Sequence, residues 1–163
     1  MTRPGRRAMF ALALALGVGG MMAGTLRAQC SDTRVTVQGD WGRANFTVQV
    51  ADDNAERAQG LMFVEEMPRM EGMLFVYERP QRAAFWMRNT LIPLDMLFAD
   101  ATGTIVTVHA NAAPLDETPI PGGDGIQFVL EINGGLAARL GIAPGDLMQH
   151  PAIGPAAALP CAG

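Results

Sequence analysis

The chain has 163 residues, of which 49% are hydrophobic, and its 12 basic and 16 acidic side chains give a formal charge of −4 at neutral pH. This composition fits one globular domain, and the acidic charge argues against nucleic acid as a partner because phosphate backbones repel it. The chain has no lysine and only one serine, Ser31, which excludes Schiff-base chemistry and a Walker-type phosphate loop and disfavours a serine hydrolase.

Residues 1–28 have the layout of a secretory signal peptide, with three early arginines, an apolar run over 8–18 and then small residues. The run is shorter than the roughly 20 residues of a membrane span, so we expect cleavage near Ala28 and no stable membrane span afterwards. A twin-arginine signal and a lipid-modified Cys30 are weaker alternatives, because only fragments of each pattern are present. The predicted mature protein is periplasmic or secreted, and its eight arginines and 16 acidic residues give a charge of −8.

The two cysteines, Cys30 and Cys161, lie at the two ends of the predicted mature chain. In an oxidising compartment we expect them to form a disulfide. A redox pair is the functional alternative, but the chain has no C-x-x-C spacing that would lower a thiol pKa. The disulfide would tether a Pro- and Ala-rich tail, residues 151–163, to the surface of a single domain at 29–150.

The hydrophobic pattern predicts a mainly β fold. Strands are predicted at 34–38, 45–50, 73–77, 84–89, 94–99, 104–109 and 127–132. Asp53 and Glu56 predict a capping box at the start of a first short helix, and Asn133 is predicted to cap a second. The segment from Ala112 to Gly125 is predicted as the longest loop. About seven short strands and two short helices favour a compact, mainly antiparallel β-sandwich or barrel.

Four segments, 57–63, 71–75, 85–95 and 129–135, together give the chain a family resemblance. They read Arg-Ala-Gln-Gly-Leu-Met-Phe, Glu-Gly-Met-Leu-Phe, Phe-Trp-Met-Arg-Asn-Thr-Leu-Ile-Pro-Leu-Asp and Val-Leu-Glu-Ile-Asn-Gly-Gly. Over residues 34–149 the chain resembles the bacterial and archaeal domain-of-unknown-function 192 family. The resemblance implies a compact β fold, and it implies no reaction because the family has no established activity.

Two carboxylates, Asp95 and Glu131, each lie in an otherwise apolar predicted strand. A buried carboxylate must be paired or must shift its pKa upward. Arg57 and Arg88 are the expected cationic partners, with additional hydrogen bonds from neighbouring polar side chains. A purely structural polar network is one interpretation, and a ligand pocket is the other.

We predict a non-enzymatic module, without a cofactor, that binds an unknown small molecule or envelope protein. Its predicted site comprises Arg57, Phe85, Trp86, Met87, Asn89, Thr90, Asp95 and Glu131. Phe85, Trp86 and Met87 would form its wall, whereas Trp41, in a turn, is expected to be the more exposed aromatic side chain.

Two alternatives use other chemistry. An envelope hydrolase or sugar-active enzyme would employ Asp95 and Glu131 as acid and base, which requires their carboxyls to lie within about 10 Å across a cleft. A copper-binding protein would use the thioethers of closely spaced methionines, although such side chains also fill gaps in cores. The four methionines are Met62, Met67, Met70 and Met73.

Overall fold

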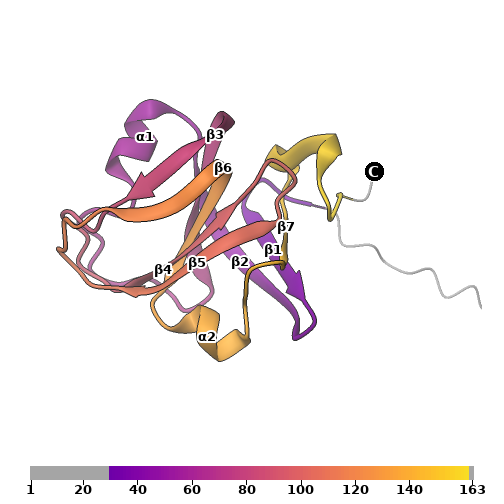
Figure 1. Cartoon of the computed structure of the whole chain (residues 1–163). Coiled ribbons are helices and arrows are strands. Elements are labelled where there is room, and N and C mark those ends of the chain that lie inside the picture. Colours follow the sequence, from indigo (N-terminus) through magenta and orange to yellow (C-terminus); the bar gives the residue numbers. More distant parts are fainter. Residues whose placement is uncertain (1–29, 162–163) are drawn as a thin grey trace, which may run out of the picture.

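The protein is built on one curled sheet of seven strands, seen in a computed structural model that describes residues 30–161 (Figure 1). The strands are β1 (Arg34–Gly39), β2 (Gly42–Ala51), β3 (Glu71–Phe85), β4 (Leu94–Ala99), β5 (Ile105–Ala112), β6 (Ile120–Asn133) and β7 (Leu147–Gln149). The helices are α1 (Asn54–Gln59), α2 (Leu136–Leu140) and the 3-10 helix η1 (Pro151–Ala156). The predicted mainly β fold is confirmed, and the predicted signal peptide lies outside the described residues.

The strands follow the order β5-β4-β6-β3-β2-β1-β7 across the sheet. The pairing is antiparallel throughout except between β2 and β3, which are parallel because the connection through α1 brings the chain back in the same direction. The two outermost strands approach each other where Thr104 bridges to Leu147. The backbone N–H of Met148 also donates to the carbonyl of Gly103 at 2.8 Å. The sheet therefore curls into a half-barrel with its edges drawn together at one end.

Hydrophobic side chains form two clusters on opposite faces of the sheet. The first cluster includes Val35, Phe46, Leu74, Leu97, Leu130, Ile132 and Met148. The second cluster includes Met73, Phe75, Met87, Met96, Phe98 and Val129. Strand β4 is buried along its whole length because its alternate residues reach both clusters.

Two predicted strands are in fact parts of one, since β3 runs without interruption from Glu71 to Phe85. Its pairing with β6 changes register between Val76 and Gln81, and this irregularity accommodates the exposed Pro80. Strand β6 likewise begins at Ile120, so the predicted loop from Ala112 to Gly125 shrinks to residues 113–119. The prediction of a long loop was wrong because its turn-type residues lie in the irregular part of this strand pair.

The first helix starts as predicted. The Asp53 carboxylate accepts from the backbone N–H of Glu56 at 2.8 Å, and the reciprocal bond completes the capping box. The predicted cap of the second helix is wrong: α2 follows Gly135 in the left-handed conformation, and the amide of Asn133 donates instead to the carbonyl of Pro68 at 3.0 Å.

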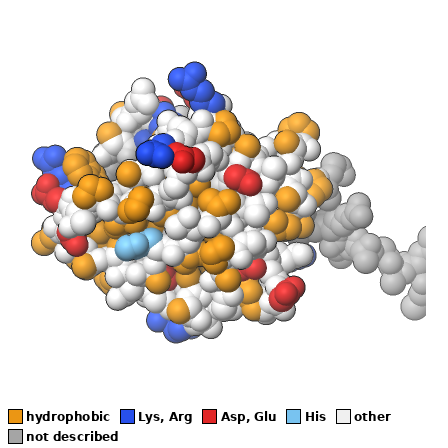
Figure 2. All heavy atoms as spheres, in the orientation of Figure 1, with side chains coloured by type: hydrophobic (Ala, Val, Ile, Leu, Met, Phe, Trp, Pro, Cys, Tyr) orange, Lys and Arg blue, Asp and Glu red, His pale blue; other side chains and the backbone are white. Residues whose placement is uncertain are grey.

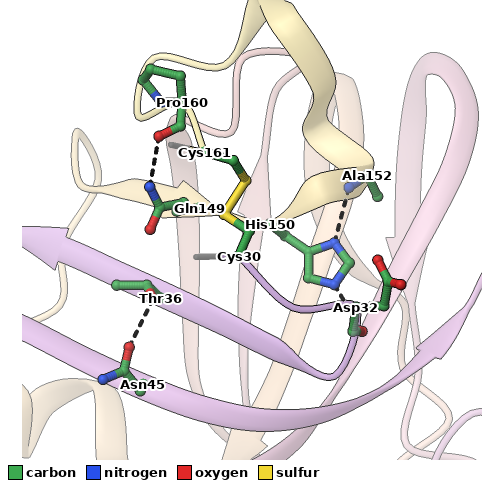
Figure 3. The surroundings of a disulfide bond; sticks show 9 residues. All are labelled: Cys30, Asp32, Thr36, Asn45, Gln149, His150, Ala152, Pro160 and Cys161. Carbon is green, nitrogen blue, oxygen red and sulfur yellow. Dashed lines mark hydrogen bonds between the residues drawn. A yellow bond between two sulfur atoms is a disulfide. The ribbon is translucent and has the colours of Figure 1, made fainter. Parts of the chain in front are cut away.

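The two ends of the described chain are fastened to each other (Figure 3). The predicted disulfide between Cys30 and Cys161 is confirmed. Beside it, the His150 ring Nε2 lies 3.0 Å from the carbonyl oxygen of Asp32. The tail is more than a surface tether, because Ile153 of η1 is buried in the first cluster. Among residues 30–161, no helix has the length and apolarity to cross a membrane.

Candidate functional site

Asp95 is fully buried on β4, and backbone donors surround its carboxylate. One oxygen accepts from the N–H of Asn111 at 2.7 Å and of Gly135 at 2.8 Å, and the other accepts from Ala137 at 2.7 Å. Asp95 thus caps α2 from a distant strand and takes the role predicted for Asn133. Its partners are backbone groups and not the predicted arginines, so Asp95 fits the structural interpretation.

Asp95 and Glu131 lie on opposite faces of the sheet. In the pairing of β4 with β6, Asp95 faces Ile132 while Met96 faces Glu131. Directly opposed residues project to the same face, and successive residues project to opposite faces. The acid–base pair that an enzyme would need is therefore contradicted, because the sheet separates the two carboxyls.

Glu131 lies at the second cluster's side of the sheet and lines a pocket of about 40 Å³. Only 4% of the residue is exposed, and within residues 30–161 no protein group hydrogen-bonds to its carboxyl, whose oxygens are open to the pocket. Burial raises the pKa of Glu131 to about 8. The pocket is lined by Arg57, Ala58, Gln59, Gly60, Leu61, Met62, Phe75, Phe85, Trp86, Arg88, Thr90 and Glu131. We call it the Glu131 pocket.

Arg57 is held rigidly at the wall of this pocket by the end of α1. Its guanidinium donates to the carbonyl of Val76 at 2.7 Å and to the side-chain oxygen of Asn54 at 2.8 Å, and it also donates to the carbonyl of Asp52. The group lies over the Tyr77 ring, 5.3 Å from its centre. These partners are neutral, so they fix the position of the guanidinium without cancelling its charge.

Arg88 and Trp86 form a second part of the wall. The Arg88 guanidinium lies 5.5 Å from the centre of the Trp86 ring, which is an arrangement favourable for a cation–π contact. The single ion pair found in the described part of the chain joins Arg82 to Asp124, so neither Arg57 nor Arg88 has a carboxylate partner there. The pocket therefore combines two uncompensated guanidinium groups with one unpartnered carboxyl.

The exposure of the two tryptophans is the reverse of the prediction. Trp86 is 47% exposed beside the pocket. Trp41 packs against the first cluster, and its indole N–H donates to the Asp146 carboxylate at 2.7 Å. The acceptor that holds Trp41 against the cluster, Asp146, is distant in the sequence. The residues around the turn therefore do not reveal that Trp41 is packed inward.

Two wider hollows adjoin the Glu131 pocket, and all three share Arg57. The first has a volume of about 330 Å³ and is lined by Arg57, Tyr77, Ala84, Phe85, Trp86 and Pro119. The second has a volume of about 320 Å³ and is lined by Asn54, Arg57, Tyr77, Glu78, Arg79 and Gln81. We call the first, which is mainly apolar, the aromatic groove. The Glu131 pocket thus lies beside two wider hollows, with Arg57 lining all three.

Five of the eight predicted site residues line the Glu131 pocket: Arg57, Phe85, Trp86, Thr90 and Glu131. The structure does not bring the other three into it. Met87 is fully buried in the second cluster, Asp95 lies across the sheet, and the Asn89 amide is directed to the sulfur of Met62 at 3.8 Å. The sequence analysis missed Tyr77, although an isolated tyrosine in an apolar strand could have indicated it.

The structure places the four methionines of the copper hypothesis in different surroundings. Met67 and Met73 belong with the second cluster, Met70 packs against the first, and Met62 lines the pocket. Met70 therefore lies apart from Met67 and Met73, and the copper hypothesis stays a prediction. Within residues 30–161 there is also no group of three His, Cys, Asp or Glu side chains placed to hold a metal ion.

Comparison with known proteins places this geometry in a family. The sequence profile of the DUF192 family, described as "Uncharacterized ACR", matches residues 34–150. A solved protein of unknown function from Novosphingobium aromaticivorans is 51% identical, covers 71% of this chain and 82% of its own, and superposes with a TM-score of 0.69. One from Sinorhizobium meliloti, provisionally described as a transcription regulator, is 39% identical over 74% of this chain and 95% of its own, with a TM-score of 0.70. A comparison with curated proteins finds no match.

Proposed function

This chain belongs to the DUF192 family, which carries no established activity, and we propose from the geometry of the Glu131 pocket that it is a non-enzymatic module that binds a small polar molecule. The molecule would place one polar group in the Glu131 pocket and the rest of its body in the adjoining hollows. Binding sites of this kind combine apolar walls with a few convergent polar groups.

The observation that carries the proposal is the unpartnered Glu131 carboxyl. Buried polar groups in folded proteins almost always have hydrogen-bond partners. Among the described residues no fully enclosed side-chain polar atom lacks one, so the Glu131 carboxyl must find its partners in the pocket. Glu131 has no such partner within residues 30–161, and it faces a pocket that is large enough for a few water-sized groups. A ligand that enters the pocket can therefore hydrogen-bond to this carboxyl.

The proposal includes export to the cell envelope. The Cys30–Cys161 disulfide supports it, because such bonds persist in oxidising compartments. Nucleic acid remains the less favoured partner: the chain is acidic, and the face in Figure 2 shows scattered basic side chains without a continuous basic surface. Fractionation of the host, followed by mass spectrometry of the N-terminus, tests the location; an intact protein in the cytoplasm would contradict export.

Ligand-observed NMR with a mixed library of organic acids, amines, amides and sugars tests the binding function. We expect binding signals from the wild-type protein that disappear in Glu131→Leu and weaken in Trp86→Ala. Val106→Ala is the matched control, because Val106 is 41% exposed and lies on β5 away from the pocket lining. Signals that persist in Glu131→Leu, or a library without any binder, would contradict the proposal.

A further inference from the structure

We propose that the Glu131 pocket receives the carboxylate of a small organic acid, held by Arg57, Arg88 and Glu131, while the apolar body of the acid occupies the aromatic groove. This inference rests on the proposed function and names the class of ligand. It follows from the size of the pocket, the balance of its hydrogen-bond donors and acceptors, and the character of the adjoining groove.

The size of the pocket admits the head group of a small acid. Its volume is about 40 Å³, and one water-sized group needs roughly 10 to 15 Å³ on the same scale. About three such groups therefore fit, which matches the carbon and two oxygens of a carboxylate. The Glu131 pocket cannot enclose a whole metabolite, so it would enclose only the head of one.

The charged donors around the pocket are the guanidinium groups of Arg57 and Arg88. Arg57 uses its guanidinium bonds on neutral acceptors and keeps its charge, and Arg88 makes no side-chain hydrogen bond within residues 30–161. The hydroxyl of Thr90 lies 3.4 Å from the carbonyl of Arg88, to which it can donate. A guanidinium group is a usual partner of a carboxylate, because its N–H groups match the two carboxylate oxygens.

Glu131 adds a further donor when it is protonated. Burial raises its pKa to about 8, so near neutral pH its carboxyl is largely uncharged and can donate its O–H to an anionic oxygen. The directly opposed neighbours on β3 and β4, Met73 and Met96, carry no charge. Tyr77 is neutral as well, because burial raises its pKa, an effect that Arg57 opposes and Glu131 reinforces. The local charge near neutral pH is therefore positive, which attracts an anion and repels an ammonium group.

The aromatic groove fits the rest of such a ligand. Tyr77, Phe85, Trp86 and Pro119 line a space of about 330 Å³, which is within the usual range for small-molecule sites. Phe85 and Trp86 line both this groove and the Glu131 pocket. An acid with an aromatic or branched apolar body can thus contact both spaces at once.

Isothermal titration calorimetry with three ligands of similar shape tests the inference: phenylacetate, neutral phenylacetamide and phenethylammonium. We expect phenylacetate to bind at least about tenfold more tightly than the other two at pH 6.5. Its affinity should fall about tenfold by pH 9.0, because the protonated form of Glu131 is lost above its pKa of about 8 while both arginines stay charged.

Variants separate the roles of the three side chains. Arg88→Gln should weaken phenylacetate binding by about tenfold or more, whereas Arg69→Gln, an exposed arginine outside the pocket, should leave it unchanged. Glu131→Gln should retain binding and remove its pH dependence, because the amide donates a hydrogen bond at every pH tested. Loss of binding in Glu131→Gln would overturn the role given to the protonated carboxyl.

The outcomes also distinguish this inference from the proposed function. Tighter binding of phenethylammonium, with affinity that rises with pH, would overturn the organic-acid class and make Glu131 an anionic counter-ion. Equal binding of phenylacetamide would overturn it too, because charge would then not be recognised. If none of the three binds but library ligands bind and depend on Glu131, the acid class fails and the binding function stands. If the library also contains no binder, both fail.

Discussion

Asp95 and Glu131 are two buried carboxyls on neighbouring strands of the same sheet, and they differ in their partners. Asp95 accepts three backbone N–H groups at 2.7 to 2.8 Å and thereby fixes the start of α2. Glu131, on the other face, has no hydrogen-bond partner in the described part of the chain and lines a pocket. Burial alone therefore does not distinguish a structural carboxyl from a binding group, whereas the count of its partners does.

The largest expected effect is the loss of the Asp95 anchor. Asp95→Ala would leave three backbone N–H groups without their acceptor, and hydrogen bonds to a charged group contribute about 1.5 to 3 kcal/mol each. We expect the free energy of unfolding to fall by about 5 kcal/mol, measured by urea denaturation. Asp40→Ala, at an exposed position, is the control. A loss below about 1 kcal/mol for Asp95→Ala would contradict the structural role given to Asp95.

Glu131 should lower the free energy of unfolding as pH rises, whereas Asp95 stabilises the fold. Its pKa of about 8 lies above the value of 4.5 expected when unfolded, so the native state holds a proton that the unfolded state releases. Stability contributed through Glu131 is therefore complete below pH 4.5 and is lost as pH rises to about 8. At about 1.4 kcal/mol per pH unit, the full loss is on the order of 3 to 5 kcal/mol.

The difference in unfolding free energy between wild type and Glu131→Gln, followed from pH 4 to 9, isolates this contribution. The opposite trend from His150, whose pKa is lowered by burial, is present in both proteins and cancels. We expect Glu131→Gln to gain stability relative to wild type as pH rises. A difference that stays constant over this range would show that the Glu131 carboxyl is not buried in its protonated form.

Substitution of the two tryptophans should change the free energy of unfolding less than substitution of Asp95 or Glu131. Trp41→Phe keeps a ring against the first cluster but removes the indole N–H that donates to Asp146. We expect a loss of about 1 kcal/mol in unfolding free energy, which is typical for one hydrogen bond. An unchanged denaturation midpoint would mean that this bond has no net effect on stability.

Trp86 should show the smallest effect on stability. Because it is 47% exposed and lines the pocket, we expect Trp86→Ala to change the unfolding free energy by less than about 0.5 kcal/mol while weakening ligand binding. The same denaturation and NMR measurements check both parts. A stability loss comparable to that of Asp95→Ala would show that Trp86 is needed for the fold and not only for binding.

Local sequence patterns were sufficient to predict much of the fold. The capping box of α1 depends on Asp53 and Glu56, three residues apart, and β4 was predicted with its exact bounds because its residues alternate within one short apolar run. The disulfide was also predictable because the chain has only two cysteines. In each case the determining residues are close in sequence or, for the two cysteines, have only one possible partner.

The features that sequence patterns could not reveal depend on distant partners. Asp95 and Glu131 look alike in the sequence, as single carboxylates in apolar runs. The backbone groups that satisfy Asp95 lie 16 to 42 residues further along the chain, and only the folded sheet brings them together. The continuous β3 was missed for a similar reason, since its pairing with β6 overrides the turn-like residues around Pro80.

The most direct test of the binding role of Glu131 is the titration of its carboxyl by carbon-13 NMR in the purified protein, without ligand and with phenylacetate. We expect a pKa near 8 in the free protein, because burial disfavours the charged form. We expect a further increase with phenylacetate, because the bound anion favours the protonated carboxyl. A titration near 4.5 that phenylacetate does not change would show that Glu131 is an ordinary solvated carboxyl and not a binding group.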